Sequence, residues 1–205
     1  KEVARLGGAI FQHCEINCHS NPGDIAPGKL NDELLEIHDY EETSILNRDL
    51  KLVEKYGTRY HAQHISTKSA VEILNEALDH KLPVTSEVTP HHLLKNNENI
   101  DISNGKYKMY PPIRTEDDRQ ALIDGLKNNI IQVIATDHAP HPEQTKDISF
   151  KLASRGVVGL ESSFPYSYKV LSQHGFSIES VIDLFTVKPS QVMGIDLDSI
   201  EKNKP

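Results

Sequence analysis

The sequence predicts an α/β fold in which parallel strands alternate with crossover helices. Four short β-forming runs are each followed by a segment that favours a helix, and this alternation is typical of parallel sheets. The strand-like runs also lead into histidine or aspartate, which is where parallel α/β folds place their chemistry. The 205 residues, 37% hydrophobic and 25% charged, suit one globular domain with a real core.

The first half of the chain contains two of these strand–helix units. Its first long helix is indicated by apolar residues near the 3.6-residue period, including Leu46, Leu50 and Val53. Ser66 or Thr67 is a good N-cap for the second long helix. The expected elements are a helix at 1–6, a strand at 9–14, a long loop at 17–31, a helix at 41–56, a strand at 59–65 and a helix at 68–80.

The second half repeats the pattern and then becomes helical. Thr115, followed by three acidic residues, is expected to cap a helix before the last strand. The expected elements are a strand at 82–89, a loop at 95–105, an extended segment at 107–114, a helix at 115–126, a strand at 130–134, a polar loop at 143–155, helices at 161–171 and 177–185, a short helix from 188, and an unstructured tail at 196–205.

Composition excludes several classes of partner and location. The net charge of −8 and the lack of a long basic run argue against general binding to nucleic acid or anionic membranes. No apolar run approaches the ~20 residues that span a bilayer. The two cysteines, Cys14 and Cys18, suit a reducing compartment, so we expect a cytoplasmic protein. Eleven histidines favour a metal or acid–base site.

The stretch Ala-Thr-Asp-His-Ala-Pro-His at residues 135–141 directly follows the last predicted strand. A carboxylate at Asp137 beside His138 and His141 is expensive to bury unless a metal ion or a proton transfer uses it. Pro140 restricts the direction of the chain that leads to His141. A solvated loop with incidental histidines is the alternative interpretation of these seven residues.

Residues at three predicted strand ends form a candidate metal site. Because strand ends converge in a parallel barrel, His13, His64 and Asp137 could meet at one point. Neutral imidazoles and a carboxylate are ordinary ligands for zinc. The alternative for either histidine is a hydrogen-bonded residue of the core.

Six motifs, which follow one another along the chain in the order that the family has, resemble those of the dihydroorotases, in particular the bacterial monofunctional type within the amidohydrolase superfamily. The 135–141 stretch, with Lys146 five residues later, matches the downstream signature of that family in full. The other motifs are Gln-His-Cys-Glu at 12–15, His-Ala-Gln-His-Ile-Ser-Thr-Lys at 61–68, Glu-Val-Thr-Pro-His-His-Leu at 87–93, Lys-Met-Tyr-Pro-Pro-Ile-Arg at 108–114 and Gly-Val-Val-Gly-Leu-Glu at 156–161.

The resemblance implies that residues 1–205 form one partial, dihydroorotase-like amidohydrolase catalytic domain. Its fold would be the C-terminal half of a (β/α)8 TIM barrel of the metal-dependent hydrolase type, with strands five to eight. The implied reaction is the reversible cyclisation of N-carbamoyl-L-aspartate to L-dihydroorotate in pyrimidine synthesis. A homodimer or an association with aspartate transcarbamoylase is implied for the full-length parent, with no nucleic-acid or membrane partner.

Family roles can be transferred to individual positions of this sequence. The resemblance implies one or two zinc ions per full-length subunit. Asp137 would also be catalytic and shuttle a proton. The implied metal ligands are His13, His64 and Asp137, and the implied substrate-binding residues are His141, Tyr110, Arg155 and Gly156.

The sequence also departs from the family pattern. The family has an asparagine where this chain has Tyr110, and an acidic residue where it has Ile16. The His-x-His pair of the first barrel strand would belong to sequence upstream of Lys1. Two alternatives therefore stay open: a non-catalytic partner or scaffold of another pyrimidine enzyme, and a hydantoinase or allantoinase. The His-Ala-Pro-His block favours dihydroorotase over the second alternative.

Overall fold

Four parallel strands form the single sheet of the described chain. The computed structural model describes residues 1–16, 23–28 and 33–197, and the structural statements below refer to these residues. Neighbours in the sheet are also neighbours in the sequence, so each connection is a crossover, as the α/β prediction required. The strands, in sheet order, are β1 (Ala9–Gln12), β2 (Arg59–Ala62), β3 (Val84–Val88) and β4 (Val133–Ile134).

Helices connect the strands and follow the last one. None of the helices in the described ranges is long and apolar enough to cross a membrane. They are α1 (Glu2–Arg5), α2 (Asp39–Tyr56), α3 (Lys68–Asp79), α4 (Pro90–Leu94), α5 (Glu116–Lys127), α6 (Glu143–Lys146), α7 (Ser163–Gln173), α8 (Ile178–Phe185) and α9 (Val187–Met193), with 3-10 turns η1 (Asn97–Asn99) and η2 (Gly105–Tyr107).

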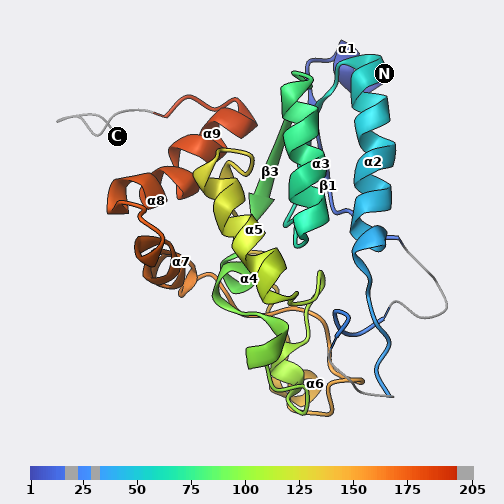
Figure 1. Ribbon diagram of the computed structural model, residues 1–205, viewed down its shortest axis with the longest axis vertical. Coiled ribbons are helices and arrows are strands. Elements are labelled where there is room, and N and C mark those ends of the chain that lie inside the picture. The colour runs from blue at the N-terminus through green and yellow to red at the C-terminus, as the bar shows by residue number, and fades with distance from the viewer. Residues whose placement is uncertain (17–22, 29–32, 198–205) are drawn as a thin grey trace.

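Helices α2 and α3 cover one face of the sheet and α5 packs beside α3 (Figure 1). Alternate strand residues, among them Tyr60, Ala62 and Val84, point into this layer and form the main core with the apolar faces of the helices. Thr67 caps α3 by accepting a hydrogen bond from the Ala70 backbone N–H, as expected of its sequence position.

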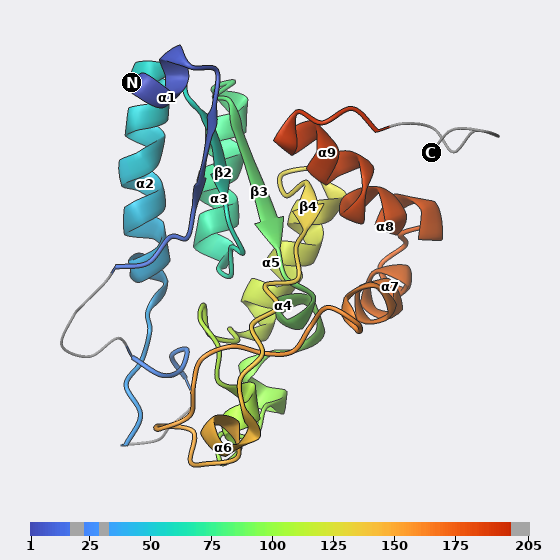
Figure 2. The same cartoon turned by 180° about the vertical axis from the view of Figure 1, so that it is seen from behind.

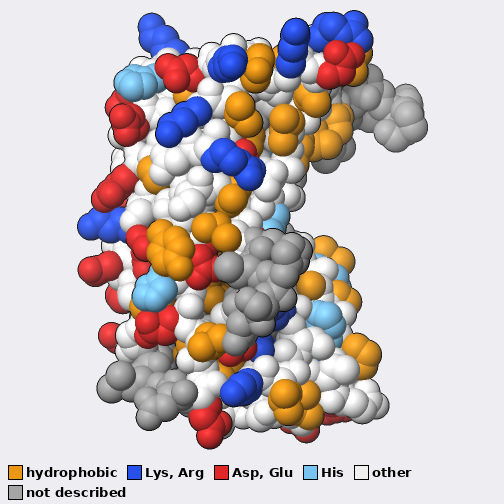
Figure 3. Space-filling model, turned by 90° about the vertical axis from the view of Figure 1, so that its right-hand side faces the viewer, with side chains coloured by type: hydrophobic (Ala, Val, Ile, Leu, Met, Phe, Trp, Pro, Cys, Tyr) orange, Lys and Arg blue, Asp and Glu red, His pale blue; other side chains and the backbone are white. Residues whose placement is uncertain are grey.

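The opposite face of the sheet is not covered by these helices (Figure 2). The molecule is hollowed on this side, away from α2 and α3 (Figure 3). Phe11 and His61 lie in ring contact, with centroids 4.9 Å apart, and His61 pairs with Glu87 at 3.0 Å. Polar and half-exposed residues on this face are what the inner wall of a barrel presents when its other strands are not part of the chain.

All four strands run in the same direction, so their C-terminal ends lie at one edge of the sheet. The segments that follow them, near residues 13, 63, 89 and 135, therefore begin side by side. This arrangement brings the sequence-predicted site residues to a common region of the fold.

The strands and loops differ in detail from the sequence prediction. The last strand begins at Val133 rather than residue 130 because the Gln132 side chain takes over part of the ladder: its Oε1 accepts from the Ser86 N–H at 2.9 Å. Residues 90–94, for which no element was predicted, form α4, and 143–146 form α6 within the predicted polar loop. The predicted loop at 17–31 lies largely outside the described residues, as does the tail beyond 197.

We expect Leu74→Ala to lower the free energy of unfolding by about 2–5 kcal/mol, because it leaves a cavity in the main core. Leu74 is 1% exposed between α3 and the sheet. Leu52→Ala on α2, where the side chain is 49% exposed, is the matched control and should change stability by less than ~1 kcal/mol. Urea denaturation of both variants measures the difference, and equal effects would contradict this core assignment.

Candidate functional site

His13 and His64 are in direct contact at the C-terminal edge of the sheet. The Nδ1 atom of His13 lies 2.7 Å from Nε2 of His64, although 51 residues separate the two in the sequence. Their rings meet edge to face, with centroids 4.5 Å apart. The parallel alignment of β1 and β2 produces this contact, since each histidine closely follows its strand.

Glu15 determines which ring nitrogen of His13 keeps a lone pair that could bind a metal ion. Its Oε2 atom lies 2.8 Å from His13 Nε2, and a carboxylate can only accept a hydrogen from that nitrogen. In the neutral ring, Nδ1 then carries a lone pair and faces His64. A carboxylate behind a metal-binding imidazole performs the same orienting role in metal sites. No role was predicted for Glu15, although its place two residues after His13 was the available signal in the sequence.

His64 has a buried nitrogen without a partner. The residue is 7% exposed, and its Nδ1 atom has no hydrogen-bond partner among the described residues. Burial, and then the neighbouring His13, lower the pKa of His64, so the ring is held in its neutral form. With His13 Nδ1 as the acceptor, His64 Nε2 donates the hydrogen bond and His64 Nδ1 keeps the lone pair. Each neutral ring therefore has one unprotonated nitrogen, which is the form that binds metal.

Backbone conformation singles out His64 and Asp137. Four described residues other than glycine have a positive φ: His64 (31°), Lys81 (58°), Asn129 (56°) and Asp137 (44°). Lys81 and Asn129 lie just past the C-caps of α3 and α5, where a left-handed residue is common. His64 and Asp137 follow strands instead and have no such explanation. Strained backbone that persists in this way is concentrated at functional sites.

Asp137 lies close enough to His64 to raise its pKa, opposing the effect of burial. It is nevertheless exposed, and no three His, Cys, Asp or Glu side chains of the described residues are grouped to hold a metal ion. The next residue, His138, anchors this loop: its Nδ1 accepts from the backbone N–H of Gly159 and of Leu160, each at 3.1 Å. The structure thus joins His13 to His64 and leaves Asp137 beside them.

The four sequence-predicted substrate residues form a connected group next to the histidine pair. Tyr110 lies between the histidine pair and the other substrate residues: its ring centroid is 5.6 Å from that of His13 and 5.2 Å from the Arg155 guanidinium. His141 Nε2 lies 2.6 Å from the Arg155 carbonyl oxygen, so this nitrogen donates. Burial raises the pKa of the Tyr110 phenol, which therefore stays a neutral hydroxyl.

Gly156 is required by the close approach of this loop to His141. Its φ of +134° favours glycine, and an added Cβ would lie 2.7 Å from the Ala139 carbonyl oxygen and 2.9 Å from His141 Nε2. Its backbone N–H donates to the Lys108 carbonyl oxygen at 3.1 Å. The glycine thus allows the segments at 108, 139 and 156 to lie against one another.

A buried polar chain that the sequence analysis missed supports the histidine end of β2. Glu42, in the first turn of α2, accepts hydrogen bonds from the Ser66 N–H at 3.0 Å and from the Ser66 hydroxyl. Arg114 Nε donates to the same hydroxyl oxygen at 3.1 Å, and its Nη1 donates to the Ile37 carbonyl. Burial raises the pKa of Glu42, while Arg114 opposes that shift. No periodic pattern signals such a contact, because its members are 24 and 48 residues apart.

We expect Arg114→Met to lower the free energy of unfolding by about 3 kcal/mol, because it removes the cation from a fully buried group. Glu42→Gln should also destabilise, but the double variant should lose less than the sum by ~1 kcal/mol or more, since both act through Ser66. Denaturant titration of the four proteins gives the coupling, with the exposed Lys51→Met as the control. Strict additivity would show that the chain through Ser66 is not cooperative.

Comparison with known sequences adds independent information. The sequence model of the amidohydrolase family matches residues 24–205. The chain is 41% identical over 203 residues to a dihydroorotase of Geobacillus sp. (strain WCH70), and 39% identical over 204 residues to a dihydroorotase of Bacillus subtilis (strain 168). Each alignment covers 98% of this chain and 48% of the relative. The chain therefore spans about half the length of these curated relatives.

Solved structures share the fold. L-hydantoinase (dihydropyrimidinase) from Arthrobacter aurescens superposes with a TM-score of 0.78 at 24% identity, covering 94% of this chain and 45% of that one. Dihydroorotase from Saccharomyces cerevisiae, in complex with 5-fluoroorotic acid, superposes with a TM-score of 0.76 at 16% identity, covering 95% and 52%. Such likenesses establish the architecture alone, and they confirm the predicted half of a (β/α)8 barrel.

Proposed function

The chain belongs to the amidohydrolase family, and on that premise we propose that the full-length protein is a dihydroorotase. It would interconvert N-carbamoyl-L-aspartate and L-dihydroorotate, with residues 1–205 as part of its catalytic domain. The observation that carries the proposal is the 2.7 Å contact between His13 Nδ1 and His64 Nε2 at the strand ends. The curated relatives named dihydroorotase support the choice of reaction within the family.

His13, His64 and Asp137 would hold zinc, as one ion or two in the full-length subunit. The lone pair on His13 Nδ1, the neutral ring of His64 and the carboxylate of Asp137 are the donors that zinc prefers. When bound, zinc would polarise the amide carbonyl and lower the pKa of water at the site. Glu15 would keep the His13 ring in its ligating orientation.

Asp137 would be the proton carrier. In the hydrolytic direction water attacks the ring carbonyl, the carbon–nitrogen bond breaks, and the departing ring nitrogen needs a proton. An exposed carboxylate beside the histidine pair can take a proton from the water and return it to that nitrogen. The backbone at Asp137 directs the side chain, since its left-handed conformation turns the chain sharply after β4.

His141, Tyr110, Arg155 and Gly156 would bind the substrate. Arg155 and the Tyr110 hydroxyl offer hydrogen-bond donors suited to carboxylate and carbonyl oxygens. His141 is held through the Arg155 carbonyl oxygen, and Gly156, which has no Cβ, lets its loop pack against His141, where its backbone would contact the substrate ring. The proposal also includes assembly of the full-length protein, either as a homodimer or with aspartate transcarbamoylase. Light scattering on the full-length protein, alone and mixed with aspartate transcarbamoylase, distinguishes the two by their molar mass.

We expect Asp137→Ala to abolish ring closure in the full-length protein, because the variant loses both a ligand and the proton carrier. Asp137→Asn, which tolerates the left-handed backbone but cannot carry the proton, should be nearly as inactive. The exposed Asp117→Asn on α5 is the control and should keep normal turnover. Spectrophotometric assay of dihydroorotate formation measures all three, and an unchanged rate in Asp137→Ala would remove this residue from the mechanism.

We expect the 205 residues alone to be inactive and to bind zinc weakly. Among the described residues β1 and β4 each have one edge without a strand partner, and open edges favour aggregation. Ring closure and zinc content, measured on this chain and on the full-length protein in parallel, test the expectation. Full turnover by the chain alone would overturn this expectation.

The hydantoinase alternative is tested on the full-length protein. Hydrolysis of hydantoin in preference to dihydroorotate would favour it.

A further inference from the structure

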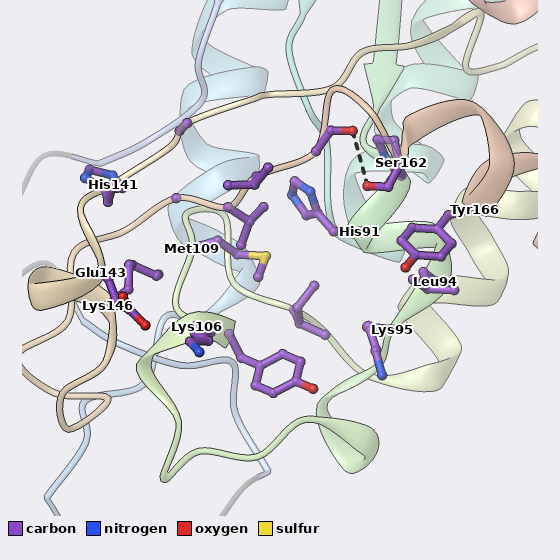
Figure 4. Close-up of a pocket in the computed structure, with 18 residues that line it drawn as sticks. His91, Leu94, Lys95, Lys106, Met109, His141, Glu143, Lys146, Ser162 and Tyr166 are labelled. Carbon is purple, nitrogen blue, oxygen red and sulfur yellow. Dashed lines mark hydrogen bonds between the residues drawn. The ribbon is translucent and has the colours of Figure 1, made fainter.

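Lys146 ends the motif at 135–146, and none of the roles proposed above uses its side chain. It is the last residue of the short helix α6, in the loop after β4. It lines a cavity of about 450 Å³ beside the proposed catalytic site, on the side that also bears His141 (Figure 4). A lysine is almost never buried without partners, yet Lys146 is only 8% exposed. Its ammonium group therefore depends on interactions inside the protein.

Two backbone carbonyl groups receive this ammonium group. Lys146 Nζ donates to the Lys108 carbonyl oxygen at 2.9 Å and to the Ser154 carbonyl oxygen at 2.8 Å. Burial, and then the charge of Lys108, lower the pKa of Lys146 to about 8, so the side chain is mostly protonated at pH 7. Hydrogen bonds from a charged donor are stronger than those from a neutral one. The side chain thus ties the segment that leads to Tyr110 to the loop that follows α6.

The backbones of the same segments are joined as well. The Lys108 carbonyl oxygen accepts a second hydrogen bond, from the Gly156 N–H at 3.1 Å. The Ser154 N–H donates to the carbonyl oxygen of Thr145, the residue before Lys146, at 2.9 Å. The chain is therefore held at residues 154 and 156, on both sides of residue 155.

Arg155, the residue in between, connects these contacts to the proposed substrate residues. Its carbonyl oxygen accepts from His141 Nε2 at 2.6 Å, and its guanidinium lies 5.2 Å from the centroid of the Tyr110 ring. A shift of the backbone at residues 154–156 would therefore change the positions of His141 and of the Arg155 guanidinium together.

Lys108 is itself fixed by a buried ion pair. Its Nζ lies 2.7 Å from Asp24 Oδ1 and donates to the Lys151 carbonyl oxygen at 2.7 Å, and the residue is 4% exposed. The other carboxylate oxygen of Asp24 accepts from the Leu35 N–H at 3.3 Å. The carbonyl group that Lys146 binds thus belongs to a residue that is anchored to two other loops.

We propose that Lys146 is a positioning residue, whose two hydrogen bonds hold Arg155 and Gly156 in the geometry that binds substrate. This role depends on the substrate contacts proposed above for those two residues. Stability alone does not account for the lysine, because burying an ammonium group is costly and an apolar side chain of similar length would fill the space without that cost. A charged donor between two carbonyl groups instead keeps two segments at a fixed separation.

The kinetic test uses the full-length, zinc-loaded protein with N-carbamoyl-L-aspartate as the substrate. Lys146→Met removes both hydrogen bonds but keeps the length of the side chain, so we expect KM to rise about tenfold, which corresponds to one charge-assisted hydrogen bond. The kcat should stay within about twofold, because the residues proposed for metal binding and proton transfer are unchanged. Lys146→Arg keeps the charge and the donors and should restore most of the affinity. Lys127→Met, at the exposed end of α5, is the control and should leave KM unchanged.

Hydrogen–deuterium exchange of the substrate-free protein gives a readout that does not depend on turnover. Because the Gly156 N–H is bonded to the Lys108 carbonyl oxygen, a peptide covering 153–160 should exchange faster in Lys146→Met than in Lys146→Arg. The β3 peptide at 84–88 should exchange as in the unaltered protein, which shows that the sheet is folded. If this peptide is unprotected in Lys146→Met, Lys146→Gln, which keeps a polar side chain, takes its place with the same expected results.

The outcomes separate this role from the proposed reaction. An unchanged KM in Lys146→Met, or equal exchange of the 153–160 peptide in all variants, would overturn the positioning role and leave the reaction standing. A loss in Lys146→Arg as large as that in Lys146→Met would also overturn it, since shape rather than hydrogen bonding would then matter. Absence of ring closure by the unaltered protein would count against the proposed function, and the exchange result would still decide the role of Lys146.

Discussion

The parallel alignment of β1 to β4 is the constraint on which the rest of the structure depends. A parallel ladder places all strand C-termini at one edge, and each connection must return across the helix-covered face. In this chain the alignment brings His13 to within hydrogen-bond distance of His64. The same geometry brings the loops after β3 and β4 together, where they form the neighbouring cavity. The histidine pair and the cavity are therefore both consequences of strand direction.

The site carries costs that the surrounding packing must offset. His64 has a strained backbone and a buried nitrogen without a partner, and Asp137 has a strained backbone at the end of β4. Each feature costs on the order of 1–3 kcal/mol and persists only where neighbouring structure holds it. For His64 that structure includes Glu42, Ser66 and Arg114, which join the start of α2 to the turn after β2. A strained backbone together with an unpaired buried nitrogen is expected where a bound ligand would pair with that nitrogen.

Most elements could be predicted because their signals are local. The helix caps at Thr67 and Thr115 each depend on a few adjacent residues, and the structure confirms them. The shortened β4 could not be predicted, since the Gln132 side-chain oxygen, and not a backbone carbonyl, accepts from the N–H of Ser86, 46 positions away. Helix α4 was missed because a proline after a strand reads as a loop, although Pro90 here occupies the first turn and Thr89 supplies the cap.

The sequence by itself determined the fold class, the order of the elements and the residues that reach the strand ends. Hydrophobic periodicity, helix-capping residues and the spacing within motifs all depend on residues that are close together in the sequence. Only the tertiary structure decided that His13 touches His64, that Glu15 orients His13, and that Asp137 lies beside the pair without completing a three-residue metal-binding group among the described residues. It also gave His91 and His92, two adjacent and chemically identical side chains, different surroundings: His92 pairs with Thr89, and His91 lines a cavity. These outcomes depend on distances between segments far apart in the chain, which no local pattern specifies.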